Sequence, residues 1–203
     1  IEIPFGTISI GNSAFYDCSN LTNITIPNSV KYIGKRAFRN CTNIDNILIP
    51  DSVTAIGDSA FVYCTSIDNV VIPNSVTTIG ENIFGHCTSL KNITIPDSIT
   101  DISYGTFSDC TNLENIAIPD GVTNIGEYAF YGCENLKNIN IPNGVKSIKE
   151  STFYGCKSLI NITIPEKVTN IGDYAFTDCE SLVSLVIPNS VKKIGYRAFG
   201  NCS

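Results

Sequence analysis

A period of 23 residues runs through the whole chain, and it limits the possible folds more than any other feature. Nine cysteines recur at this step from Cys18 to Cys202, and nine prolines recur at the same step from Pro4 to Pro188. Sequences with a constant period of about 20–50 residues fold as stacks of similar units, in which each unit packs against its neighbours. Residues 1–203 are therefore expected to form one continuous solenoid rather than separate domains.

The first half of each unit has the pattern of a short β-strand. Ile24 and Ile26 alternate with Asn23 and Thr25, which is the periodicity of a strand with one buried face. Equivalent strands of successive units would pair in parallel, about 4.8 Å apart. Pro27 has no backbone N–H group, so it ends the hydrogen-bonded ladder. The resulting parallel sheet is expected to form the concave side of the solenoid.

The second half of each unit predicts another extended segment followed by a tight turn. Val30 and Ile33 suit the extended segment, while Ala37 and Cys41 are four residues apart and share one face of a helical turn. The expected fold is a strand-rich α/β repeat, namely a right-handed solenoid of about nine 23-residue units. Short helical turns or 3₁₀ segments are expected on its convex side.

A column of glycines precedes this turn, at residues 11, 34, 57, 80, 126, 172 and 195. Ser103 and Lys149 replace the glycine in two units. A position that needs a positive φ rarely accepts both of these residues. We therefore interpret the glycines as favourable for the turn but not required by its backbone conformation.

Composition excludes several classes of function. The net charge is −6 and only 16% of the residues are charged, so the chain lacks the clustered Lys and Arg of a nucleic-acid groove. No apolar run reaches the roughly 18–20 residues of a membrane helix, so no membrane span is expected in this segment. The single histidine, His86, falls on a variable surface turn, and there is no Cys-x-x-Cys pair and no phosphate-binding loop. The sequence predicts no metal, no cofactor and no enzymatic activity.

The cysteine column has two interpretations, a disulfide framework or a ladder of buried thiols. Stacked cysteines would have Cα atoms about 5 Å apart, within disulfide range, but parallel side chains would keep the Cβ atoms near 5 Å instead of about 3.8 Å. Each cysteine also ends an apolar set, where a free thiol behaves as a small hydrophobic group. We therefore predict structural free thiols at Cys18, Cys41, Cys64, Cys87, Cys110, Cys133, Cys156, Cys179 and Cys202.

Ligand-binding residues are expected where the sequence varies on a repeated backbone. One such column, between the two inward-facing residues of each strand, contains Thr25, Leu48, Val71, Thr94, Ala117, Asn140, Thr163 and Val186. A second column, three positions earlier, contributes Ile160 and Val183. Leu48 with Val71, and Ile160 with Val183 and Val186, would form two exposed apolar patches of the kind that mark interaction sites. The alternative is a sheet face that binds no partner.

Two other features remain open to both a functional and a structural interpretation. An asparagine column at residues 23, 46, 69, 92, 115, 138 and 161 is either a polar strip that contacts ligand or a ladder of amides bonded between units, and we favour the ladder. Tyr128, Tyr131, Tyr154 and Tyr174 cluster on the convex side, either as an interface or as surface packing, and we favour packing.

The unit reads Leu-x-x-Ile-x-Ile-Pro-x-Ser-Val-x-x-Ile-Gly-x-x-Ala-Phe-x-x-Cys, as in residues 21–41. This pattern resembles the 23-residue leucine-rich repeats of BspA-like surface proteins, the Treponema pallidum class, over the whole chain. The resemblance implies a right-handed leucine-rich-repeat solenoid. It also implies a cell-surface or secreted protein of a host-associated bacterium or anaerobic protist, which adheres to host matrix proteins or to other cells.

The resemblance thus favours a non-catalytic protein-binding module that acts through its concave face. The alternative function is a rigid spacer that presents another domain. Neither end of the chain departs clearly from the repeat and no signal peptide is present, so we expect residues 1–203 to be a segment of a longer protein. The resemblance carries over no ligand, and the oligomeric state is not predicted.

Overall fold

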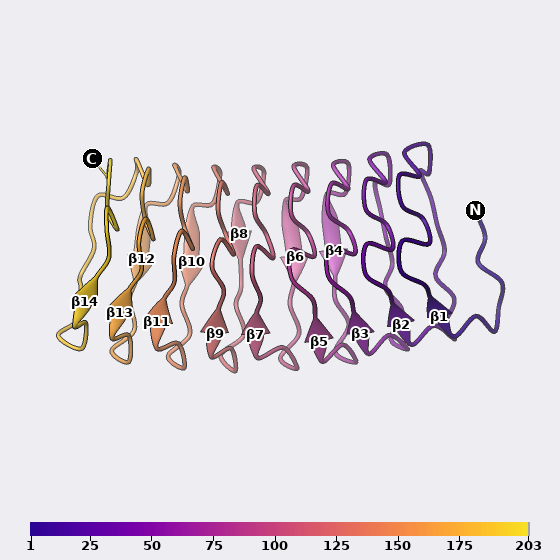
Figure 1. Ribbon diagram of the computed structural model, residues 1–203, viewed down its shortest axis with the longest axis horizontal. Helices are drawn as coiled ribbons and strands as arrows, with labels where there is room; N and C mark the ends of the chain where they lie inside the picture. Colours follow the sequence, from indigo (N-terminus) through magenta and orange to yellow (C-terminus); the bar gives the residue numbers. More distant parts are fainter. Residues whose placement is uncertain (203) are drawn as a thin grey trace.

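The computed structural model describes residues 1–202 as a β-solenoid whose coils stand side by side along its long axis (Figure 1). The N- and C-termini lie at opposite ends of the stack. The phenylalanine rings from Phe15 to Phe199 form eight successive stacked pairs, one for each turn of the solenoid. The predicted strand-rich solenoid is therefore confirmed, with about eight complete turns in place of nine units.

The strands lie in two rows, and both rows are parallel with a step of one repeat. The first row contains β4 (Asn69–Val71), β6 (Asn92–Thr94), β8 (Asn115–Ile116), β10 (Asn138–Asn140) and β12 (Asn161–Thr163). The second row contains β1 (Ser9–Ile10), β2 (Tyr32–Ile33), β3 (Ala55–Ile56), β5 (Thr78–Ile79), β7 (Asp101–Ile102), β9 (Asn124–Ile125), β11 (Ser147–Ile148), β13 (Asn170–Ile171) and β14 (Lys193–Ile194). Single bridges such as Asn161↔Ser184 extend the first row beyond its strands.

A proline turn connects the two rows in each coil. The Pro27 carbonyl accepts a hydrogen bond from the Val30 N–H group at 3.0 Å, and the same bond recurs one coil on, between Pro50 and Val53. Proline suits this position because its φ is fixed and it has no N–H group to leave unpaired. The turn therefore sets the point at which the chain leaves the first row and enters the second.

The predicted helical turns on the convex side are wrong, since residues 1–202 contain neither an α-helix nor a 3₁₀ helix. Backbone donors alternate there: the Ala37 N–H bonds within its own turn to Gly34, at 3.2 Å, whereas the Phe38 N–H bonds to Ala60 of the next coil, at 2.8 Å. Arg36 also adopts a left-handed φ of 55°. A helix needs successive i→i−4 bonds, and this backbone uses every second donor between coils.

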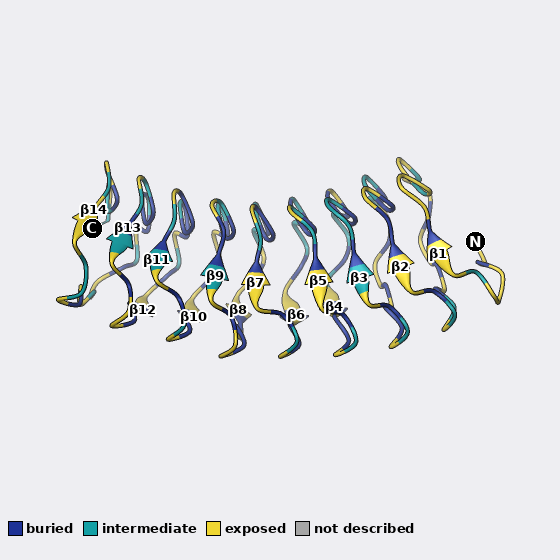
Figure 2. Ribbon diagram, turned by 60° about the horizontal axis from the view of Figure 1, so that its bottom comes forward, coloured by how far each residue is buried: buried dark blue, intermediate teal, exposed yellow. Residues whose placement is uncertain are grey.

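The interior is filled by the same residue types in every coil. Buried and exposed segments alternate at the same places along successive coils (Figure 2). Phe38, Phe61 and Phe84 are fully buried, and the stacked rings have centroids 5.4 and 5.5 Å apart. The stack therefore gives one continuous core, in which each coil is packed by the coils on either side.

The glycine column is explained by close approach between coils, which corrects our interpretation of these residues. Gly57 has no left-handed φ, but a Cβ atom at this position would lie 2.7 Å from the backbone nitrogen of Lys35. Gly11, in the first coil, has no atom within 4 Å of the same position. The interior glycines therefore let neighbouring backbones pack closely.

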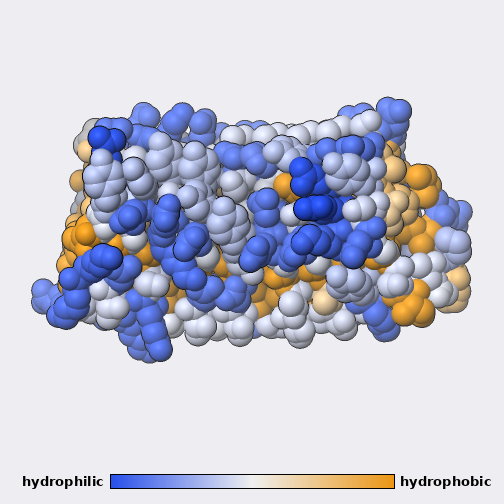
Figure 3. Space-filling view, in the orientation of Figure 1, coloured by the Kyte–Doolittle hydropathy of each residue, from blue (hydrophilic) through white to orange (hydrophobic). Residues whose placement is uncertain are grey.

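The two ends of the stack are more apolar than its middle. In Figure 3, hydrophilic side chains cover the centre of the view and apolar side chains gather towards both ends. Phe5 is 91% exposed at the N-terminal end, and Val183 and Ile194 are exposed at the other. Because an end coil packs on one side only, part of this exposure reflects position in the stack.

Candidate functional site

The ten predicted ligand-binding residues are all exposed in the structure, at the outer face of the first row. The exposed residues are Thr25, Leu48, Val71, Thr94, Ala117, Asn140, Ile160, Thr163, Val183 and Val186. The register that pairs Asn46 with Asn69 places Leu48 and Val71 next to each other, 73% and 59% exposed. Val186, which is 80% exposed, lies in the last coil of this row, beyond β12. The two apolar patches are thus separated by Thr94, Ala117 and Asn140.

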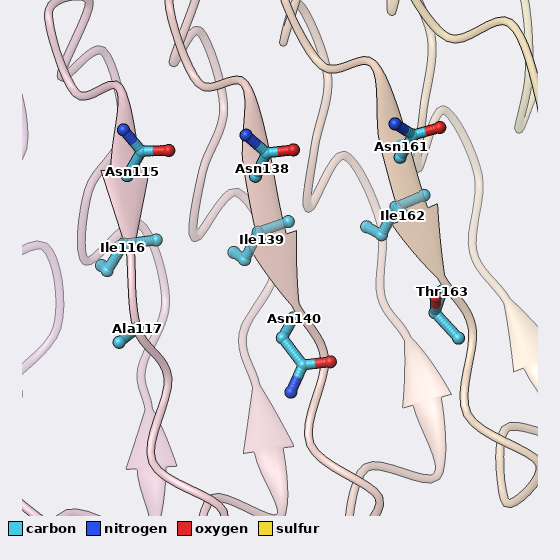
Figure 4. Close-up of a pocket in the computed structure, with 9 residues that line it drawn as sticks. All are labelled: Asn115, Ile116, Ala117, Asn138, Ile139, Asn140, Asn161, Ile162 and Thr163. Carbon is cyan, nitrogen blue, oxygen red and sulfur yellow. The ribbon is translucent and has the colours of Figure 1, made fainter.

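A shallow hollow of about 520 Å³ occupies the middle of this face (Figure 4). Its floor is formed by Ile116, Ile139 and Ile162, which are buried residues of β8, β10 and β12. One wall contains three asparagines and the opposite wall contains Ala117, Asn140 and Thr163, which belong to the predicted column. A second hollow of about 330 Å³ shares Asn161, Ile162 and Thr163 and continues to Ile164, Glu166, Ser184, Val186 and Pro188.

The predicted ladder of asparagine amides is wrong for most of this column. Among the described residues, one amide bond joins adjacent coils within the column, from Asn92 Nδ2 to Asn69 Oδ1 at 3.0 Å. Asn115, Asn138 and Asn161 make no such bond to one another. The spacing of parallel strands allows a direct amide bond, as between Asn92 and Asn69, so the orientation of each amide and not the spacing decides whether the bond forms. These three amides face the hollow instead.

The hollow is electrically neutral. None of its nine lining residues is charged. Beside it, Lys137 Nζ lies 2.7 Å from Glu114 Oε2, so these two charges neutralise each other. The hydrogen bond from Lys137 lowers the pKa of the Glu114 carboxyl group. A ligand in the hollow would therefore meet amide and apolar groups in place of a net charge.

Tyr128, Tyr131 and Tyr154 pack on one another, whereas Tyr174 contacts Tyr196 edge-on. Tyr131 and Tyr154 stack with centroids 4.9 Å apart, and Tyr128 lies against Tyr131 at 5.8 Å. His86 stacks on Tyr63 at 4.4 Å. The structure thus supports surface packing for this cluster.

All nine cysteines are free thiols, and the seven from Cys41 to Cys179 are buried. The Cys110 Sγ–H donates to the Phe84 carbonyl of the preceding coil at 3.2 Å. Burial raises the pKa of the Cys41 thiol to about 11 and that of the Cys179 thiol to about 12. Since the thiolate is the reactive form, these cysteines serve packing rather than chemistry.

Residues 1–202 contain neither a metal-binding cluster nor a membrane-spanning helix. No three His, Cys, Asp or Glu residues in this range are grouped so that they would hold a metal ion. None of the segments in this range forms a helix long and apolar enough to cross a membrane. The first-row face therefore remains the main candidate site.

Comparison with known proteins identifies the family. The family described as "BspA type Leucine rich repeat region (6 copies)" matches residues 1–113 and 100–203, which together span the chain. The chain belongs to this family. The predicted resemblance is thereby confirmed, and the solenoid is a leucine-rich-repeat fold. No curated protein matches the sequence.

Solved structures of bacterial leucine-rich-repeat proteins have the same fold. A leucine-rich repeat protein of Treponema pallidum is 29% identical, with 90% of this chain and 77% of that chain covered and a TM-score of 0.60. A leucine-rich cell surface protein of Faecalibacterium prausnitzii is 29% identical, with 100% and 82% covered and a TM-score of 0.62. The pneumococcal vaccine antigen PcpA is 20% identical, with 99% and 69% covered and a TM-score of 0.66, and it shows the fold alone. The first two of these relatives are leucine-rich-repeat proteins by their descriptions, as the family of this chain is.

Proposed function

We propose that this BspA-type solenoid is a non-catalytic protein-binding module of a cell-surface or secreted protein. Its ligand is a host matrix protein or a protein on another cell, and it binds across the outer face of the first row. A single observation carries this proposal. The backbone repeats from coil to coil, whereas the exposed side chains of the first row vary.

The chemistry of the face supports protein recognition. Leu48, Val71 and Val186 expose large apolar groups that gain free energy on burial, while the neutral hollow between them supplies amide donors and acceptors. The similarity to a leucine-rich cell surface protein supports the expected location. The buried residues hold the coils together, so the residue types in the exposed columns can differ from coil to coil.

The test is a solid-phase binding screen against matrix, plasma and epithelial surface proteins. The test variant carries Leu48→Asp, Val71→Asp and Val186→Asp. The matched control carries Thr77→Asp, Thr100→Asp and Thr123→Asp, which add the same charge at exposed positions outside the first row. We expect saturable binding that the first variant loses and the control retains.

A rigid spacer is the second candidate, because the uninterrupted phenylalanine stack favours a stiff rod. A spacer predicts no saturable binding by the wild-type protein, or equal losses in both variants. Circular dichroism spectra that match the wild-type spectrum are required of each variant, so that loss of binding is not loss of folding.

A further inference from the structure

We propose that Asn143 is a site of spontaneous modification, at which the side-chain amide is converted to a carboxylate by the next backbone nitrogen and by water. Asn143 and Gly144 form the only Asn-Gly pair of the chain. They occupy the proline turn that connects the first row to the second. The proposal concerns the chemistry of this turn, so it holds whether or not the first-row face binds a partner.

The reaction has water as its one co-reactant. The Gly144 nitrogen loses its proton and attacks Cγ of Asn143, and Nδ2 leaves as ammonia. Water then adds to one of the two carbonyl carbons of the five-membered imide that results. Cleavage of the bond at Cγ gives aspartate, whereas cleavage at the backbone carbonyl gives isoaspartate, in which the main chain runs through the side chain. The net change is amide plus water to carboxylate plus ammonium, with no transfer of electrons.

Both reacting groups are accessible in the structure. Asn143 is exposed and Gly144 is half-buried. Within residues 1–202, neither the Asn143 amide nor the Gly144 N–H makes a hydrogen bond, so no bond has to break at a reacting atom. The turn is closed by one bond, from the Val145 N–H to the Pro142 carbonyl at 3.0 Å. The nitrogen can approach Cγ when this turn opens, and a glycine hinders that rotation least.

Other coils carry a tether that this turn lacks. The residues in the position of Gly144 include Ser52 and Ser75, whose hydroxyl groups donate to carbonyls of the preceding coil at 2.6 and 2.7 Å. The equivalent carbonyl for Gly144 is that of Val122, and a Cβ atom on Gly144 would lie 3.1 Å from its oxygen. A serine here could therefore form the same bond. Without it, the turn at Asn143 opens more readily than the tethered turns.

Modification would add negative charge beside the first-row face. The strand register sets Asp120 and Glu166 at the same turn position as Asn143, in the coils on either side. A carboxylate in the place of the Asn143 amide would complete a row of three like charges in successive coils, and these repel one another. Isoaspartate would also lengthen the backbone inside the turn. The modified chain is therefore expected to unfold at a lower urea concentration than the unmodified chain.

The experiment incubates the folded chain at 37 °C and pH 7.4 and measures the modification of each asparagine by proteolysis and mass spectrometry. The matched variants are Gly144→Ser, which supplies a Cβ atom and the hydroxyl tether, and Gly144→Ala, which supplies the Cβ atom alone. We expect Asn143 to react faster than every other asparagine of the wild-type chain. Since one hydrogen bond corresponds to about a three- to ten-fold change in the open population, Gly144→Ser should react about three- to ten-fold more slowly than Gly144→Ala.

A reciprocal variant moves the reactive pair to another coil. Ser75→Gly removes the tether and places a glycine after Asn74, so Asn74 should become a second reactive site. Serine occupies this turn position in other coils, so Gly144→Ser is expected to fold, and a thermal midpoint equal to the wild-type value checks this.

An Asn143 that stays unmodified in the folded chain would overturn the proposal. The urea-unfolded chain, in which every turn is open, then shows whether the fold or the pair itself prevents the reaction. Faster modification of another asparagine would also overturn it. Equal rates for Gly144→Ser and Gly144→Ala, or an unreactive Asn74 in Ser75→Gly, would contradict the role given to the missing tether.

Discussion

Substitution of an interior glycine tests the close stacking of coils on which the fold depends. In Gly57→Ala, the new Cβ atom would lie 2.7 Å from Lys35 N and 3.0 Å from Gly34 C, both backbone atoms of the preceding coil. Relief of this overlap requires the two coils to separate, and overpacking of this kind costs about 1–3 kcal/mol. The lower entropy of the unfolded chain returns about 0.4–1 kcal/mol. We expect a net loss of about 1–2 kcal/mol in the free energy of unfolding.

Gly11→Ala is the matched control. Its Cβ atom has no neighbour within 4 Å and its φ is not left-handed, so only the entropy gain remains. Urea unfolding at 25 °C, followed by circular dichroism, measures both variants against the wild-type protein. The reasoning is refuted if Gly57→Ala unfolds at the same urea concentration as Gly11→Ala. Ser103 and Lys149 show that the column can accept a side chain when the neighbouring coil adjusts. The loss of stability in Gly57→Ala therefore measures the cost of that adjustment.

Three further predictions follow from the core and the surface charges. Because burial raises the pKa of the interior thiols, the folded chain retains protons that the unfolded chain loses above pH 9, the ordinary value for the thiol. The free energy of unfolding should therefore fall as the pH rises above 9, by about 1.4 kcal/mol per pH unit for each buried cysteine; urea unfolding at pH 7, 9 and 10 measures this, and Cys110→Ala should have a shallower slope. Phe130→Ala should cost about 3–5 kcal/mol, since this fully buried ring stacks on Phe107 and Phe153; a cost equal to that of Phe199→Ala at the half-buried end would contradict the stacked core. Lys137→Ala should change stability by less than about 1 kcal/mol, because its ion pair with Glu114 is about half exposed, and calorimetry that finds a larger loss would reveal a contact beyond this pair.

The 23-residue period and the alternation of apolar and polar residues were sufficient to predict the parallel pairing of successive coils and the core of this protein. The alternation of Asn23, Ile24 and Thr25 indicates a strand, and the structure places Ile24 inside and its two neighbours outside. The exposed column from Thr25 to Val186 follows from the same alternation, whereas Ile160 and Val183 lie just outside the strands and do not. This part was predictable because a side chain's face in a strand depends only on the parity of its position.

The convex turn was not predictable from spacing, because Ala37 and Cys41 share a face in a helix and also in this turn. The overlooked signal is the residue type before each cysteine, since Asp17, Asn40 and Gly132 all tolerate the left-handed φ found there. The prediction for the asparagine column was wrong because occupying the same position in each repeat does not determine whether the amides hydrogen-bond to one another. The orientation of each amide decides that: Asn92 bonds to Asn69, whereas Asn115, Asn138 and Asn161 do not bond to one another.

The central claim, that the first-row face binds a protein partner, is tested most directly by hydroxyl-radical footprinting of the chain with a ligand from the binding screen. Oxidation of Leu48, Val71 and Val186 should fall when the ligand is bound, while oxidation of the convex Tyr131 and Tyr154 should stay unchanged. Protection of the tyrosines, with unchanged oxidation of the three first-row residues, would contradict the claim and place the interface on the convex side.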